Sequence, residues 1–300
     1  MQFKIKKRRF KDYEGLLYIS PFIIGFLVFQ LYPFISSLIY SFTDLALMGD
    51  FKFIGLSNYI KMFTKDTEFW GSLKVTFYYV LMAVPMKLVF ALFIAMLLNM
   101  KLKSINFFRT VYYLPSILGG SIAVAVMWRF LFMHDGLMNQ VLGIFNIPPV
   151  GWLGDPKISL YTIGLLSVWQ FGSSMVLFLA GLKQIPQNLY EAAAIDGASK
   201  IKQFFVITLP MITPILLFNM VMQTISAFQE FTGAFVITNG GPMKSTYLYG
   251  MMLYNNAFVD FKMGYASAQS WVLFLIIIVV TGGLLKSSSH WAYYEDGGDF

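Results

Sequence analysis

Four polar side chains interrupt an apolar run of the sequence at the spacing of one helical face. Asn219, Gln223, Ser226 and Glu230 are four, three and four residues apart, so a helix through this run would carry them in one stripe. Polar side chains in a lipid-spanning helix are costly and usually face the bundle interior or a wet cavity. We interpret the stripe as the lining of a solute pathway, although hydrogen bonding between packed helices would also account for it.

A second candidate surface lies in another apolar run, at Trp169, Gln170 and Ser173. An aromatic ring beside amide and hydroxyl groups is the combination that sugar recognition requires. Lys87 falls in the middle of a further apolar run. Its long stem would reach an interface or a neighbouring subunit, so the sequence assigns it no role.

Residues for catalysis are scarce. The chain has no cysteine and only two histidines, His134 and His290, with no His-Glu-x-x-His pattern, so neither a thiolate nucleophile nor a zinc site is expected. The phosphate-binding pattern Gly-x-x-x-x-Gly-Lys-Ser/Thr is also absent. We predict a protein that is not an enzyme, holds no cofactor of its own and does not hydrolyse ATP.

The elements that carry these residues must lie in lipid. Hydrophobic residues make up 57% of the chain, charged residues only 12%, and the mean hydropathy is +0.65, whereas soluble domains carry about 25% charge. Apolar runs of about 20 residues span a bilayer as helices. We predict an all-α integral membrane protein with six spans, at residues 16–42, 73–100, 111–132, 160–182, 204–228 and 268–285.

Lysine and arginine indicate the orientation, because cytoplasmic loops keep an excess of both. With the N-terminus inside, thirteen lie in cytoplasmic segments and six in external segments, so both termini are expected in the cytoplasm. We attribute the net charge of +7 to a topology anchor rather than to nucleic-acid binding. The expected organisation is a basic N-terminus at 1–15, a six-span transmembrane domain at 16–286 and a cytoplasmic tail at 287–300.

The loop at 186–204, between the fourth and fifth spans, has the features of a short capped helix followed by a break. Asn188 and Glu191 fit a capping box, Ala192 to Ala194 are strong helix formers, and Gly197 suits a C-terminal cap. Capping chemistry alone allows either a plain connector or a projecting docking helix.

The spacing within this loop resembles the coupling loop of binding-protein-dependent ABC importer permeases. A glutamate followed by two alanines, a glycine six residues after the glutamate and a Leu-Pro pair twelve residues later are the shared features. The matching residues are Glu191, Ala192, Ala193, Asp196, Gly197, Ala198, Leu209 and Pro210. Further matches to the carbohydrate branch, of the maltose type, are Gly55 to Tyr59, Tyr113 to Pro115, Thr238 to Pro242 and Gly264 to Ala268.

The resemblance implies the type I ABC importer permease fold in a bacterial cytoplasmic (inner) membrane. It implies a heterodimer with a second homologous permease, two copies of a cytoplasmic ATP-binding subunit that hold ATP and Mg²⁺, and an extracytoplasmic solute-binding protein. Coupling to the ATPase would use Glu191, Ala192, Ala193, Asp196, Gly197, Ala198 and Lys200. Carbohydrate contacts would fall at Trp169, Gln170, Ser173, Gln223, Ser226 and Glu230, with Asn219 on the same stripe.

Two questions stay open at the level of the sequence. The solute is expected to be an oligosaccharide, but a neutral sugar, a uronate oligosaccharide and a phosphorylated polyol all remain possible. An ion-coupled secondary transporter is the alternative function, and it would need a carboxylate within the membrane. Glu230 is the nearest candidate for that role.

Overall fold

The computed structural model describes residues 14–46, 51–100 and 105–293, and its regular elements there are all helices. The basic residues before 14, the pair Lys101 and Lys103, and the tail from 294 lie outside this range. The described chain forms two compact units, which are considered separately. One comprises residues 1–65 and 255–272, and the other comprises 66–254 and 273–300.

The first unit begins with a long helical segment. Helix α1 (Glu14–Phe26), a π-helical turn (Leu27–Leu31) and α2 (Tyr32–Ser41) follow one another without a break. The unit also contains α3 (Ser57–Thr64), a π-helical turn (Asn255–Val259) and the start of α16 (Met263–Ser288).

Residues that carried the family resemblance hold the first unit together. The buried Asn58 amide donates to the carbonyl oxygens of Ser41 (2.9 Å) and Thr43 (2.8 Å), which satisfies the backbone where α2 ends. The Gly264 amide donates to Leu45 O at 2.8 Å. A Cβ on Gly264 would lie 2.2 Å from the Thr43 carbonyl oxygen, so only glycine allows this approach.

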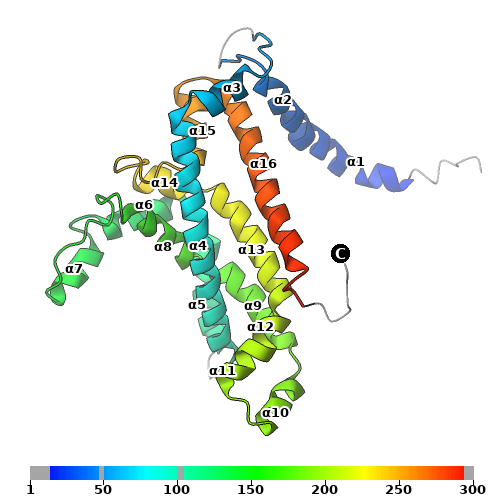
Figure 1. Ribbon diagram of the computed structural model, residues 1–300, viewed down its shortest axis with the longest axis vertical. Helices are drawn as coiled ribbons and strands as arrows, with labels where there is room; N and C mark the ends of the chain where they lie inside the picture. Colours follow the sequence, from blue (N-terminus) through cyan, green and yellow to red (C-terminus); the bar gives the residue numbers. More distant parts are fainter. Residues whose placement is uncertain (1–13, 47–50, 101–104, 294–300) are drawn as a thin grey trace, which may run out of the picture. The chain divides into compact units, whose positions relative to one another are not determined.

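The second unit is built around α4 (Thr67–Asn99), which Asp66 caps by accepting from the amides of Glu68 and Phe69. Helices α8, α9, α13 and α15 pack against α4 (Figure 1). The other elements are α5 (Ile105–Leu118), α6 (Ile122–Phe132), α7 (Leu137–Ile144), α8 (Ser159–Trp169), α9 (Gly172–Gln184), α10 (Gln187–Ile195), α11 (Lys200–Gln203), a π-helical turn (Phe204–Thr208), α12 (Leu209–Met211), α13 (Thr213–Phe228), α14 (Thr232–Ile237), α15 (Tyr249–Tyr254) and the rest of α16.

Three predicted spans are single long helices and three are broken. Residues 17–41, 67–99 and 263–288 are apolar and long enough to cross a membrane. The runs predicted at 111–132, 160–182 and 204–228 are instead bent pairs, with angles of 102°, 48° and 66°. If each bent pair is one span, the count reaches the predicted six.

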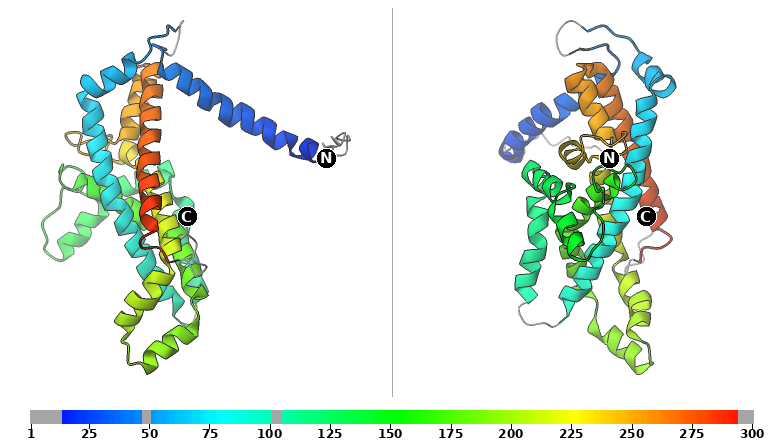
Figure 2. Two further views of the ribbon diagram at one scale, coloured as in Figure 1. Left: turned by 45° about the vertical axis from the view of Figure 1, so that its right-hand side comes forward. Right: turned by 90° about the vertical axis from the view of Figure 1, so that its left-hand side faces the viewer.

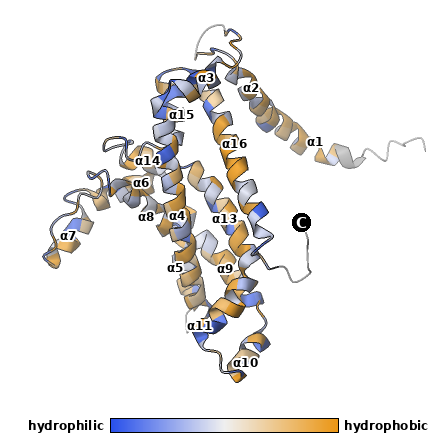
Figure 3. Cartoon of the chain, in the orientation of Figure 1, coloured by the Kyte–Doolittle hydropathy of each residue, from blue (hydrophilic) through white to orange (hydrophobic). Residues whose placement is uncertain are grey.

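The breaks have local causes. Gly120, at φ +75°, ends α5 in the left-handed region, which disfavours other residues. Pro210 and Pro214 flank the break at Ile212, where the missing proline N–H groups interrupt the helical hydrogen bonds. Figure 3 shows that hydrophobic residues prevail along the middle of α16, whereas α10 and α11 mix both kinds.

Gly172, at the start of α9, lies directly against the backbone of α5. A Cβ there would lie 2.7 Å from the Tyr112 carbonyl oxygen and 2.8 Å from Ser116 Oγ. Ser116 Oγ itself donates to Gln170 O and accepts from the Ser173 amide, both at 3.0 Å. The glycine therefore permits the contact that fixes the bend between α8 and α9.

We predict that Gly172→Ala lowers the free energy of unfolding by about 1–3 kcal/mol, because backbone atoms of α5 must move away. Thermal unfolding of the purified protein in detergent measures the change. Gly282→Ala on α16 is the control, since nothing lies within 4 Å of its Cβ position. Equal melting temperatures for the two variants would contradict the claim that Gly172 permits a close contact between α5 and α9.

Candidate functional site

A small cavity within the second unit brings polar side chains from several helices together. Its volume is about 80 Å³. Its polar lining comes from α4, from the end of α8 with the residue after it, and from α13 with the second residue after it. These residues are Tyr79, Lys87, Ser167, Gln170, Gln223, Ser226 and Glu230. Four predicted pathway residues, Gln170, Gln223, Ser226 and Glu230, therefore share one cavity.

A second cavity of about 120 Å³ adjoins this one, since Tyr79, Ser167, Gln170 and Glu230 line both. Its other walls include the glycine break at Gly120 and the residues from Gln229 to Gly233. We call the two together the inner cavities. Polar groups concentrated in a unit of apolar helices are what a solute pathway requires.

Glu230 lies beyond the helix on which it was predicted. Helix α13 ends at Phe228, so the stripe does not continue to Glu230 on one helical face, and that part of the prediction is wrong. The Glu230 Oε1 atom accepts a 2.7 Å hydrogen bond from the Gly233 amide at the start of α14. A Cβ on Gly233 would lie 2.9 Å from this oxygen, so glycine allows the bond.

Gln170 is positioned by the two breaks beside it. It follows α8 directly, and its carbonyl oxygen accepts from Ser116 Oγ of α5. A Cβ on Gly119 would lie 3.0 Å from the Gln170 side-chain carbonyl group. The bends that interrupt two predicted spans therefore place this amide at the cavity.

Three other predicted pathway residues lie elsewhere. Asn219 is 1% exposed and donates to Ile215 O within its own helix at 3.1 Å. Trp169 packs beside Trp128, with ring centroids 6.0 Å apart, and lines an apolar cavity with Pro85 and Phe171. Ser173 is exposed. None of the three lines the inner cavities.

Tyr79, Ser167 and Lys87 also line the cavity, although the sequence predicted no role for them. Tyr79 and Lys87 are eight residues apart on α4, and Ser167 precedes Gln170 by three residues. Both spacings keep side chains on one helical face. A search for polar residues at helical spacing, which identified the stripe on α13, would also have identified these residues on α4 and α8.

The coupling segment, residues 186–204, folds as a capped helix followed by a second turn. Gly197 lies at φ +75°. Its amide donates to Ala194 O at 3.1 Å, and the Ala198 amide donates to Ala193 O at 2.8 Å. This is a Schellman motif, and the predicted glycine cap is confirmed.

The predicted capping box is wrong. Helix α10 begins at Gln187, with Pro186 as its N-cap residue and no side-chain cap. Asn188 therefore lies inside the first turn, because proline with its fixed φ starts the helix two residues earlier than expected. Glu191 is exposed and makes no ion pair among the described residues.

Further bonds fix the second half of the coupling segment. Ser199 Oγ accepts from the Lys202 amide at 3.3 Å and so caps α11. Lys200 Nζ donates to Gln203 Oε1 at 3.2 Å. The Tyr190 and Thr208 hydroxyls are 2.8 Å apart, which joins α10 to the turn that leads into α12. The remaining residues that were predicted to couple to the ATPase lie on or just after α10. They are Ala192, Asp196 and Ala198.

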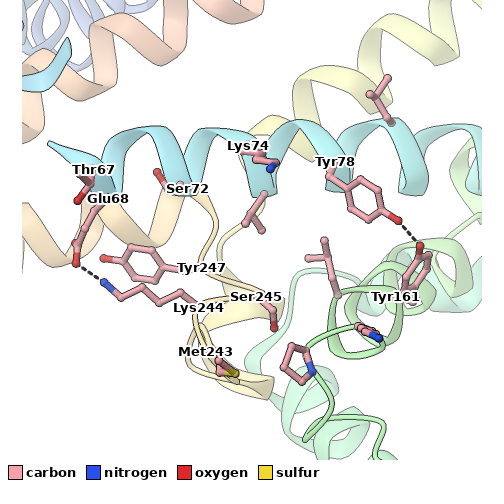
Figure 4. Close-up of a pocket in the computed structure, with 16 residues that line it drawn as sticks. Thr67, Glu68, Ser72, Lys74, Tyr78, Tyr161, Met243, Lys244, Ser245 and Tyr247 are labelled. Carbon is pink, nitrogen blue, oxygen red and sulfur yellow. Dashed lines mark hydrogen bonds and ion pairs between the residues drawn. The ribbon is translucent and has the colours of Figure 1, made fainter. Parts of the chain in front are cut away.

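The coupling segment and the segment after α14 lie at opposite ends of the second unit (Figures 1 and 2). At the latter end, a cavity of about 930 Å³ lies among the start of α4, the start of α8 and residues 243–247 (Figure 4). Glu68 and Lys244 form an ion pair there. The hydrogen bond from Lys244 to Glu68 raises the pKa of the lysine above its usual value.

Comparison with known proteins identifies the family. Residues 68–289 match the model of the binding-protein-dependent transport system inner membrane component. The chain belongs to this family. The probable ABC transporter permease protein YesP of Bacillus subtilis (strain 168) is 52% identical, with 97% of this chain and 96% of that protein covered. The arabinooligosaccharides transport system permease protein AraP of the same organism is 35% identical over 91% and 87%.

A solved structure supports the fold. A chain of the bacterial alginate ABC transporter, in complex with its alginate pentasaccharide-bound periplasmic protein, matches with a TM-score of 0.77 at 22% identity, covering 94% of this chain and 97% of that chain. The predicted recognition and the all-α permease fold are both confirmed. This chain is a multi-pass membrane permease of the sugar ABC transporter type, and its relatives are permease subunits rather than enzymes.

We predict that Gly197→Ala destabilises the coupling segment by about 1 kcal/mol or more, because alanine is strained at positive φ. Amide hydrogen exchange over residues 187–203 should become faster. Gly197→Asn is the matched control and should exchange nearly as the wild type does, since asparagine tolerates this conformation. Unchanged exchange in the alanine variant would rule out a role for the cap in ordering this segment.

Proposed function

We propose that this chain is one of two permease subunits of an ATP-driven, binding-protein-dependent importer of an oligosaccharide. The observation that carries the proposal is the pair of inner cavities, where amide, hydroxyl and charged groups face one space among apolar helices. Such groups suit a solute with many hydroxyls. The name of the relative AraP, which refers to arabinooligosaccharides, supports the same class of solute.

The mechanism is alternating access driven by a separate ATPase. Two copies of a cytoplasmic ATP-binding subunit hold ATP and Mg²⁺ and receive the coupling segment. Closure of the ATPase dimer moves α10, and the bond between Tyr190 and Thr208 passes the movement towards α12 and α13. A second homologous permease completes the pathway.

The proposed orientation places the N-terminus, the C-terminus and α10 in the cytoplasm of a bacterial cell, by the excess of lysine and arginine. The opposite end of the second unit then faces outwards. An extracytoplasmic binding protein docks there, near residues 239–245, and delivers the sugar.

An ion-coupled secondary transporter is the competing function, and Glu230 would be its ion-binding carboxylate. Reconstitution in proteoliposomes with the partner subunits separates the two. We expect the sugar-loaded binding protein to stimulate ATP hydrolysis and ATP-dependent uptake. Uptake driven by a proton or sodium gradient without ATP would refute the importer.

The exposed tip of the coupling segment provides a second test. Ile195, at the end of α10, is 87% exposed, and an apolar side chain projecting there fits a cleft on another subunit. We predict that Ile195→Asp lowers binding-protein-stimulated ATP hydrolysis about tenfold or more, because the interface would bury an unpaired carboxylate.

Ile144→Asp is the matched control, since Ile144 ends α7 and is 76% exposed. Stimulation should persist in this control. Equal loss in both variants, or retained stimulation in Ile195→Asp, would contradict docking through α10.

A further inference from the structure

Lys87 on α4 is a buried ammonium group that forms no close ion pair among the described residues. The residue is 9% exposed. Ion pairs within the described residues join His134 to Asp135, Lys244 to Glu68 and Lys262 to Asp260, and none of them includes Lys87. An ionisable group inside a membrane span is expensive and usually marks a functional position.

The side chain of Lys87 faces the same cavity as Glu230. Glu230 Oε1 is occupied by the Gly233 amide, whereas Oε2 has no hydrogen bond within the described part of the chain. One free donor group and one free acceptor atom therefore meet in a cavity of about 80 Å³. They come from different elements, α4 and the segment between α13 and α14.

Among the described residues that line this cavity, Lys87 and Glu230 are the ionisable side chains apart from the Tyr79 phenol, so one positive group faces one negative group. A solute carboxylate would be attracted to Lys87 but repelled by Glu230. A sugar hydroxyl both donates and accepts, so uncharged sugar hydroxyls can use both groups together. Gln170, Gln223 and Ser226 add further neutral donors and acceptors.

We propose that Lys87 and Glu230 are specificity-determining residues of the pathway, which together bind the hydroxyl groups of an uncharged sugar residue. This inference rests on the proposed function and adds a residue from α4 to a pathway that the sequence placed on two other spans. The pair makes this point of the pathway selective for an uncharged sugar over a uronate.

Direct binding to the detergent-solubilised complex, without ATP or binding protein, tests the selectivity. Isothermal titration would compare an uncharged trisaccharide with a uronate trisaccharide of the same linkage. We expect the wild type to bind the uncharged sugar more tightly. Glu230→Gln leaves Lys87 unopposed and should shift the ratio of affinities towards the uronate by about tenfold or more.

Lys87→Arg keeps the charge and should retain the preference of the wild type. A wild type that prefers the uronate, a ratio unchanged by Glu230→Gln, or a preference lost in Lys87→Arg would each overturn the proposal. These measurements do not depend on ATP, so they can fail while the importer itself is active.

Uptake by the reconstituted importer distinguishes a binding pair from a merely structural ion pair. With an uncharged oligosaccharide that the binding protein carries, Lys87→Gln and Glu230→Gln should each reduce uptake about tenfold or more. The double variant should fall at least as far, since both ligands are lost. Recovery in the double variant would indicate a structural pair, where removing both charges relieves the cost of removing one.

The control is Lys286→Gln, an exposed lysine near the end of α16, which should transport as the wild type does. ATP hydrolysis without binding protein should also be the same in Lys286→Gln as in the wild type. If the wild type itself shows no ATP-dependent uptake, the proposed function fails, whereas unaffected uptake in both single variants refutes only the role of the pair.

Discussion

The cost of placing polar groups in lipid is the constraint on which the rest of this structure depends. Backbone amides and carbonyls in a bilayer must bond to each other, and helices achieve this within one segment. Polar side chains are not satisfied by the hydrogen bonds of their own helix backbone. They therefore usually face the bundle interior or a wet cavity, where other polar groups lie. In the second unit, this places Lys87, Gln170, Gln223 and Glu230 around one cavity.

The same constraint explains why the breaks in the spans matter. A broken helix exposes backbone groups, which is tolerated in a membrane only inside protein or beside a wet cavity. Ser116 Oγ bonds the backbone on both sides of the α8–α9 bend, and Gly120 lines the second inner cavity. The breaks are therefore part of the candidate pathway, because they supply its bends and position Gln170.

The coupling segment follows a different rule, since water can satisfy its polar groups. Its order comes from local bonds: the Schellman motif at Gly197, the cap at Ser199 and the link from Tyr190 to Thr208. Local bonds make a projecting helix rigid without support from a core, which suits an element that transmits movement between subunits. Ile195 at its tip remains exposed.

The sequence by itself determined the family, the membrane-spanning helices and the coupling segment with its glycine cap. Each of these depends on composition or on spacing within one short stretch, and such properties are local. Two predictions from local patterns were wrong. The N-cap residue of α10 is Pro186 and not Asn188, and α13 ends before Glu230.

Only the tertiary structure decided which polar residues face one another. It brought Tyr79 and Lys87 of α4 to Gln223 of α13, and it left Asn219 and Trp169 out of the cavity. The periodicity of a helix says which residues share a face, but it does not say what that face meets. That depends on packing between helices far apart in the chain, here set by close approaches such as the one at Gly172.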